Sequence, residues 1–317
     1  MIIVFYFVSA FLHARGTYGS DIKILTIYSL KGPSGVGMIR LFEEPPKISR
    51  FDVKVEALAQ ADLMAARFLS GQALVGILPP NMAAKIRAMG RDVQSAAVIG
   101  EGMLTLLSSD PGISSFEDLR GKTVEVAGQG ATPDFVFRKI LSSRFLVPER
   151  DVKLSYSLAN PEIAQSLIAA RVSIALLPEP FATMARLGRP ELKSIADIQE
   201  EWVKLGGTTA AGNYPMTLLV VDTAFASANP AALDLILSKV KESIEWVRSH
   251  PAEAGVMAEK HDMGIKANVV AAALPKSNYV FVPASEARPS MEALFRVFLE
   301  YEPASIGGAL PEDGFYR

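Results

Sequence analysis

The strongest constraint on the fold of this chain is a repeated alternation of short apolar runs with helical patterns. The runs Ala73–Leu78 and Val172–Leu177 are almost wholly apolar. A strand that is apolar on both faces must be covered on both faces, which is typical of parallel sheets flanked by helices. The alternation of such strands with helices therefore predicts an α/β fold.

The alternation occurs twice. One series covers residues 22–103 and a second covers residues 104–214, and a further buried strand, Met216–Val221, follows them. The remainder reads as helical and begins with a long helix that Pro251 ends. The chain has 317 residues, enough for two domains. We therefore expect two Rossmann-like lobes with a ligand cleft between them, because ligands prefer domain interfaces.

In open α/β sheets, ligands lie beyond the carboxyl ends of the strands. That rule selects the loops 29–36, 79–82, 100–102, 128–133 and 178–180. The irregular stretch 188–213, rich in Gly, Thr and Ala, is expected to contain little regular structure apart from a short helix near Trp202.

The loop at 128–133 has the clearest pattern. Gly128 and Gly130 follow a β-branched run and precede a helical pattern. Thr132 is expected to cap that helix and Pro133 to take its first position. Glycines at such a turn let backbone amides approach a ligand, and the helix dipole favours negative charge there. Similar turns also occur in α/β units that hold no ligand, so a purely structural role stays open.

A second glycine-rich turn follows the first strand, at residues 32–37. Ser34 is expected to cap a helix whose apolar face includes Met38, Leu41 and Phe42. The Ser34 hydroxyl either caps this helix or donates to a ligand oxygen, and the two roles are compatible.

Composition excludes several functions. The net charge is −2, without the basic excess that nucleic-acid binding requires, so no nucleic-acid partner is expected. The sequence has no cysteine and three histidines, His13, His250 and His261. These numbers exclude a thiolate zinc site, a cysteine nucleophile and a His-rich metal site, and we expect no cofactor, no metal and no catalytic residue. His250 and His261 are interpreted as residues at helix ends, where cations complement the dipole.

The first twelve residues are apolar but too few to span a bilayer. Their length fits the core of a secretory signal, although no Lys or Arg precedes them. We expect residues 1–20 to be a signal peptide and the protein to be periplasmic or secreted, without a lipid-anchor cysteine. The alternatives are a hydrophobic first strand or a mis-assigned start codon.

Four stretches resemble one known family. They are DLMAARFLSGQALVGILPP, SFEDLRGKTVEVAGQGATPD, IAQSLIAARVSIALLPEPFATMA and NPAALDLILSKVKESIEWVRSHPAEA. In their order and spacing they resemble the type II periplasmic substrate-binding proteins of ABC transporters, in the nitrate, sulfonate, taurine and thiamine-precursor branch. The resemblance covers most of residues 21–260 and is weak past residue 265.

The resemblance implies a monomeric solute receptor that hands a small, anionic organic ligand to an ABC permease and ATPase complex. It places residues 21–103 and 215–317 in one lobe and 104–214 in the other, with hinges near 100–103 and 213–216. It also implies ligand contacts at loop positions in both lobes: Leu30, Lys31, Pro33, Ser34, Gly35, Val36, Pro80, Asn81, Gly102, Gly130, Ala131, Thr132, Pro133, Glu179 and Tyr214.

Several of these side chains have a second interpretation. Glu179 either contacts a ligand cation or lies in a solvated turn between two prolines. Lys31 either neutralises an anion or is an exposed loop lysine. Glu101 is either a hinge contact or an exposed turn residue. The sequence departs from nitrate-binding relatives, because none of its histidines falls near a cleft loop. Aromatic candidates at the cleft are limited to Tyr28 and Tyr214, which argues against a flat heteroaromatic ligand.

The alternative function is an enzyme on the same fold, such as a menaquinone-pathway-type enzyme, which should lack a leader. Relatives in fold that depend on cysteines are excluded, because the sequence has none. A transcription regulator needs a basic N-terminal helix-turn-helix, and the sequence contains none. Fold analogy alone does not establish a function.

Overall fold

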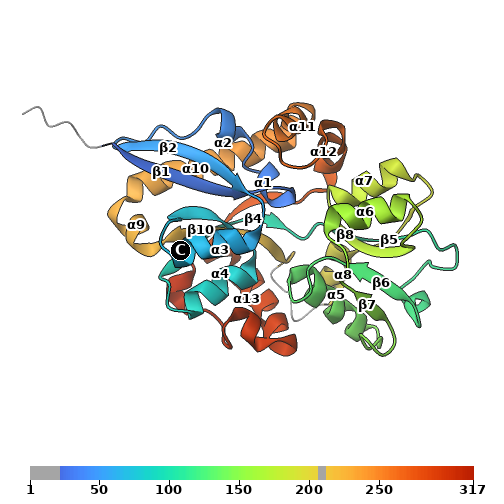
Figure 1. Ribbon diagram of the computed structural model, residues 1–317. Coiled ribbons are helices and arrows are strands. Elements are labelled where there is room, and N and C mark those ends of the chain that lie inside the picture. Colours follow the sequence, from blue (N-terminus) through green and yellow to red (C-terminus); the bar gives the residue numbers. More distant parts are fainter. Residues whose placement is uncertain (1–21, 206–211) are drawn as a thin grey trace, which may run out of the picture.

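The computed structural model describes residues 22–205 and 212–317 and shows two α/β lobes side by side (Figure 1). The predicted signal peptide lies outside the described residues. The strands are β1 (Lys23–Leu30), β2 (Phe51–Leu58), β3 (Val75–Leu78), β4 (Val93–Glu101), β5 (Leu104–Ser108), β6 (Thr123–Val126), β7 (Lys153–Ser155), β8 (Ile174–Pro178), β9 (Lys193–Asp197), β10 (Pro215–Asp222) and β11 (Tyr279–Pro283).

The helices alternate with these strands and then dominate the last third of the chain. They are α1 (Pro33–Val36), α2 (Arg40–Glu43), α3 (Ala61–Leu69), α4 (Pro80–Ala88), α5 (Thr132–Ser143), α6 (Asn160–Ile168), α7 (Phe181–Gly188), α8 (Ile198–Lys204), α9 (Thr223–Ala228), α10 (Pro230–Ser249), α11 (Pro251–Lys260), α12 (Ala267–Ala273) and α13 (Ala284–Tyr301). Short 3₁₀ turns lie at Glu117–Leu119, Leu274–Lys276, Pro303–Ile306 and Asp313–Phe315. Among the described residues, no helix is both long and apolar enough to cross a membrane.

The first sheet has six strands in the order β11-β4-β10-β3-β1-β2, and the second has five in the order β7-β6-β8-β5-β9. We call the elements around them the first and second lobes. In both sheets the chain visits three consecutive parallel strands in the same spatial order. In the first lobe the chain runs from β1 outward to β2 and back across to β3, and in the second from β6 outward to β7 and back to β8. The predicted α/β fold with two Rossmann-like lobes is therefore confirmed.

Right-handed crossovers explain where the helices lie. Because the direction of winding reverses after β2, α2 covers one face of the first sheet and α3 and α4 cover the other. The contacts agree, since α2 packs against α10, whereas α4 packs against α3 and α13. Burial follows position in the sheet. Central β3 (VGIL) is buried throughout, whereas edge strand β2 alternates half-buried and exposed residues.

Several sequence-based expectations were wrong. The stretch after β1 is not one helix but two short ones, α1 and α2, separated by a turn. The region 188–213 contains β9 as well as α8 near Trp202, while residues 206–211 lie outside the described part. Strand β11 was missed within the part that reads as helical, and α13 accommodates Pro289 in its interior.

Candidate ligand-binding site

The carboxyl ends of the parallel strands of both sheets face the connection between the lobes. In the first sheet β1, β2 and β3 run parallel, and β4 shares their direction because antiparallel β10 lies between β3 and β4. Strand β4 therefore ends at the same edge, and the chain passes directly from Glu101 to β5. In the second sheet β5 is antiparallel to β8, so it begins at the edge where β8 and β6 end. The two carboxyl edges thus meet at the crossover.

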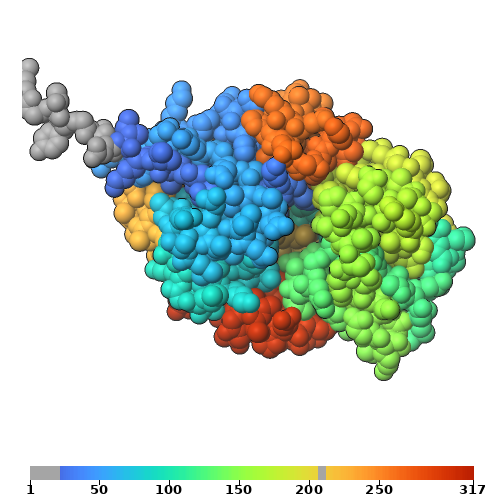
Figure 2. Space-filling model, viewed as in Figure 1, coloured from blue at the N-terminus to red at the C-terminus, as the bar shows by residue number. Residues whose placement is uncertain are grey.

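The sequence-predicted residues lie at these two edges. In the first lobe Leu30 ends β1, and Pro80 and Asn81 start α4 directly after β3. In the second lobe the glycine turn follows β6, and Glu179 follows β8. In space-filling representation the surface is hollowed between the first lobe, blue and cyan, and the second lobe, green and yellow (Figure 2).

Gly102 and Tyr214 tie the two crossovers together. The amide of Gly102 donates to the Tyr214 carbonyl at 2.8 Å, and its carbonyl accepts from the side-chain amides of Asn213 and Asn278. A Cβ on Gly102 would lie 2.6 Å from Cε1 of Tyr214, so only glycine fits. The Tyr214 hydroxyl is fully buried and donates to Gln199 at 2.8 Å, and burial raises its pKa well above the usual value. Tyr214 is thus buried at the crossover and has no surface in the hollow.

The loop after β1 accepts hydrogen bonds from side chains of β10 and β11. Thr217 donates to the Ser34 hydroxyl at 3.3 Å, and the Tyr279 hydroxyl donates to the Pro33 carbonyl at 2.6 Å. The cap of α1 is Gly32, without a side-chain hydrogen bond, so Ser34 does not cap its helix as predicted. Its hydroxyl is instead placed by β10, whose Thr217 lies 183 residues further along the chain.

The remaining residues of this loop and of the loop after β3 differ in exposure. Leu30, Gly35 and Val36 are buried, whereas Pro33 and Ser34 are partly open. Lys31 is exposed, and its ammonium pairs with Asp262. Pro80 is buried in the first turn of α4, and the amide oxygen of Asn81 is buried without a hydrogen-bond partner in the part of the chain that the structure describes.

The helix that follows the glycine turn after β6 does not have the predicted cap. The cap of α5 is Ala131, so Thr132 and Pro133 are its first and second residues. No side chain caps α5, and the Asp134 carboxylate instead accepts from the Gly130 amide in the turn before the helix, at 2.9 Å. The Thr132 side chain is 3% exposed, and its hydroxyl has no hydrogen-bond partner within residues 22–205 and 212–317. A buried hydroxyl without a hydrogen-bond partner is costly, so Thr132 is an unsatisfied polar group at the start of α5.

Asp134 is itself neutralised by its surroundings. Arg138 and the Tyr156 hydroxyl each donate to it at 2.6 Å. Burial, together with the hydrogen bond to Asp134, raises the pKa of Tyr156. The turn thus carries a compensated charge, and its conformation is fixed from within the second lobe.

Glu179 is neither solvated nor free. Its side chain is 1% exposed, accepts from the Thr183 amide at 2.9 Å and pairs with Arg186 at 2.7 Å. Burial and then the charge of Glu179 raise the pKa of Tyr279. Glu179 therefore lies near a first-lobe residue and faces the crossover from the second lobe, but its charge is already paired.

The charges at the two edges follow one pattern. The cations Lys31, Arg138 and Arg186 each pair with a carboxylate of the chain. Glu101 lacks such a partner in the described residues, and burial raises the pKa of its carboxyl. Neutral donors, namely amides and hydroxyls, are thus the groups that these loops offer to an anion.

Sequence reasoning missed Thr217, Tyr279, Asp134 and Asn278 as parts of the site. Asp134 was within reach, because an acidic residue in the first helical turn is a known signal for a helix start. The other three reach the site only through strand pairing over long sequence distances.

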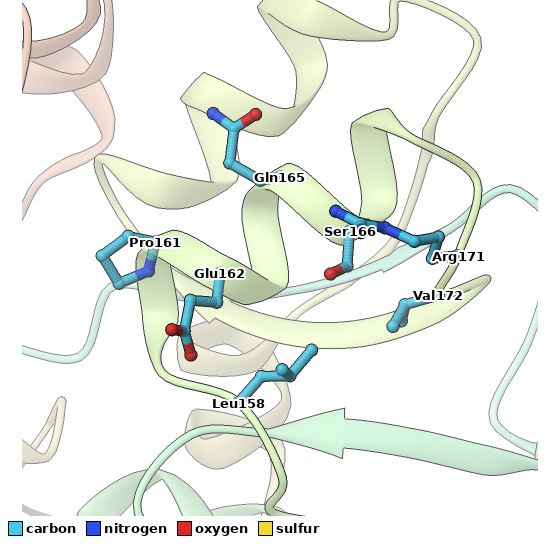
Figure 3. A pocket seen from close by; sticks show the side chains of 7 residues that line it. All are labelled: Leu158, Pro161, Glu162, Gln165, Ser166, Arg171 and Val172. Atoms are coloured by element: carbon cyan, nitrogen blue, oxygen red, sulfur yellow. The ribbon is translucent and has the colours of Figure 1, made fainter.

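A further concave region lies on the second lobe alone (Figure 3). It has a volume of about 560 Å³, and its polar side chains come from α6 and the loop that follows it, with Glu162 near one end and Arg171 near the other. Because the first lobe contributes no lining residue, movement of the lobes would not enclose a ligand there.

The winding of the two sheets and the meeting of their carboxyl edges at a double crossover define the type II periplasmic-binding-protein fold. A family model described as NMT1/THI5 like matches residues 51–254, more than half of the chain. The chain belongs to this family, which confirms the resemblance detected in the sequence. No curated protein sequence matches the chain.

Solved structures agree on the fold. An ABC transporter protein from Parabacteroides distasonis has a TM-score of 0.78 at 24% identity, over 93% of this chain and 99% of that one. The periplasmic aliphatic sulphonate binding protein SsuA from Escherichia coli has a TM-score of 0.69 at 18% identity, over 88% and 87%. A mutant of DszB in complex with biphenyl-2-sulfinic acid has a TM-score of 0.61 at 12% identity, over 88% and 92%.

Proposed function

We propose that this protein is the solute receptor of an ABC importer. It captures a small organic ligand between its lobes and passes it to a permease and ATPase complex. The observation that carries the proposal is the meeting of two carboxyl edges, from two separate sheets, at a crossover in a chain of the NMT1/THI5-like family. Such an arrangement suits hinge closure around a ligand.

The wider assignment follows from this role. The first lobe comprises residues 21–103 and 215–317, and the second comprises 104–214. Residues 1–20 are an export signal, the protein acts outside the cytoplasm, and it works as a monomer. No step of this role requires covalent chemistry, a metal or a cofactor.

The ligand is proposed to be anionic and to be held by neutral donors. The cations on the candidate loops are paired, so an anionic headgroup would be bound by amides at the start of α5 and by the Thr132 hydroxyl. The amino end of a helix favours negative charge. Sulfonates are the first class to test, because one protein of similar fold is a sulphonate binding protein.

The test is native mass spectrometry of freshly purified protein, followed by calorimetry and thermal-shift assays. The probes are alkanesulfonates, carboxylates and vitamin precursors. A retained small molecule, or a saturable shift of the melting temperature with one class, is expected. If no class shifts the melting temperature at saturating concentration and no molecule is retained, the receptor proposal fails.

An enzyme on the same fold is the second candidate, favoured by the similarity to DszB. The sequence has no cysteine, so such an enzyme would have to work without a thiol nucleophile. Incubation with the ligand found above, followed by mass analysis of the solution, separates the two. An unaltered ligand supports the receptor, whereas a product formed in more than stoichiometric amount supports the enzyme.

A further inference from the structure

The two lobes also touch through a contact outside the crossovers, between α5 and α13. Phe135 of α5 stacks on Tyr301 of α13 with ring centroids 6.0 Å apart and an interplanar angle of 8°. The same ring meets Phe298 edge-on at 5.3 Å. These three rings form an apolar contact that joins a second-lobe helix to a first-lobe helix.

Polar contacts surround the rings. Lys139 pairs with Glu300 at 2.7 Å, and the hydroxyls of Ser142 and Tyr301 lie 3.1 Å apart. Both charged side chains are partly exposed, so solvent screens this ion pair and it orients the contact more than it holds it. The stacked rings supply most of the stabilisation.

The contact acts on the helix that starts at the glycine turn. Thr132 and Pro133 begin α5, and a Cβ on Gly130 would lie 3.5 Å from the carboxylate of Glu302, the residue directly after α13. The position of α13 therefore fixes how close the turn comes to the first lobe.

A second contact between the lobes, of α12 with α7, lies on the opposite side of the crossover from the contact of α13 with α5 (Figure 1). Both α12 and α13 lie beyond residue 254, where the family match ends. The lobe-bridging elements are thus a feature of this chain's carboxyl-terminal part.

We infer that Tyr301 and Glu300 are positioning residues of the ligand site. Through Phe135 and Lys139 they hold α5, and the glycine turn at its start, against the first lobe, and so set the balance between open and closed lobes. This inference rests on the proposed function only in assigning a ligand to the turn. The effect on lobe separation does not depend on that assignment.

The absence of cysteine allows a direct test, because two introduced cysteines would be the only labelling sites. Met89→Cys and Leu187→Cys place spin labels on exposed positions, one in each lobe. Pulsed electron–electron double resonance on the ligand-free protein should give one narrow distribution of distances between the two spin labels. Adding Tyr301→Ala should create a longer-distance population, whereas Tyr301→Phe, which keeps the ring, should leave the distribution unchanged.

Reversing the charges of the Lys139–Glu300 pair provides an independent test that leaves the aromatic rings intact. Lys139→Glu should also lengthen the distances, and Lys139→Glu combined with Glu300→Lys should restore them. Circular dichroism confirms that each variant is folded. Distance distributions of Tyr301→Ala and Lys139→Glu that both match the parent would overturn the inference, whatever the outcome of the ligand screen.

Discussion

The carboxylate of Asp134 lies 2.9 Å from the amide nitrogen of Gly130, so the turn that precedes α5 is closed by the helix's own third residue. This hydrogen bond fixes the conformation of the glycine turn in the absence of a ligand. A site organised in advance avoids the cost of ordering a loop on binding.

Replacing Gly130 with valine should abolish ligand binding. Gly130 has a φ of 72°, which a β-branched residue adopts only under strain, and the new side chain would occupy the space next to Glu302. The matched control is Gly121→Val. Gly121 has a φ of 76° but lies at the other end of β6. Both variants should lose about 1–2 kcal/mol of stability, and only Gly130→Val should lose affinity in calorimetry. Equal affinities would return the turn to a structural role.

Asp134→Ala should destabilise the second lobe. The carboxylate is 2% exposed, and its removal leaves the Gly130 amide and the Tyr156 hydroxyl without this acceptor, while Arg138 keeps its ion pair with Glu149 at 2.9 Å. Loss of hydrogen bonds to a buried charged group costs about 1–3 kcal/mol, measured by urea denaturation. Asp234→Ala, on the exposed face of α10, is the control and should cost far less. A loss equal to that of the control would contradict this role of Asp134.

Gly102→Ala should strain the crossovers. Its methyl group would lie 2.6 Å from Cε1 of Tyr214 and 2.7 Å from Oδ1 of Asn213, so the two crossovers would be forced apart. Overpacking of this kind costs about 1–3 kcal/mol. Gly100→Ala is the control, because its nearest neighbour, Oγ1 of Thr217, would lie 3.4 Å from the new methyl group. A lower melting temperature for Gly102→Ala alone is expected, and identical melting curves would sink the packing argument.

Glu101→Gln should stabilise the protein at neutral pH. Burial raises the pKa of this carboxyl above its usual value, so the folded state binds the proton more tightly than the unfolded state does. The charged form therefore weakens folding above the raised pKa, and the penalty disappears below the unfolded value. Scanning calorimetry should show a higher melting temperature for Glu101→Gln at pH 7 and no difference from the parent near pH 3. Glu245→Gln, exposed on α10, should show neither effect.

The lobes, the buried strands and the candidate loops were predictable, because continuous apolar runs such as β3 report burial on both faces directly. Strand β9 (KSIAD) was missed because it is an edge strand whose residues are only partly buried and whose sequence resembles a loop. Strand β11 was missed because its partner, β4, lies far away in the sequence.

The contacts made by the candidate residues were less predictable than the places of their loops in the fold. Thr132 is a good cap by residue type, yet it makes no cap hydrogen bond, and the turn is closed by Asp134, whose carboxylate Arg138 and Tyr156 hold in place. Likewise, the sequence of the Pro-Glu-Pro turn predicts an exposed glutamate, but Glu179 is buried because it pairs with Arg186 of α7. Such choices depend on tertiary neighbours that local propensity does not encode.

The backbone hydrogen bond from Gly102 to Tyr214 has a mechanical consequence. Two independent connections between lobes would permit bending, twisting and sliding, each of which a ligand would have to suppress. Two connections bonded to each other at one point resist sliding there, so rotation about that point is the movement they leave. The joint lies apart from the loops at the strand edges, and those loops are therefore free to change from one solute to another without altering it.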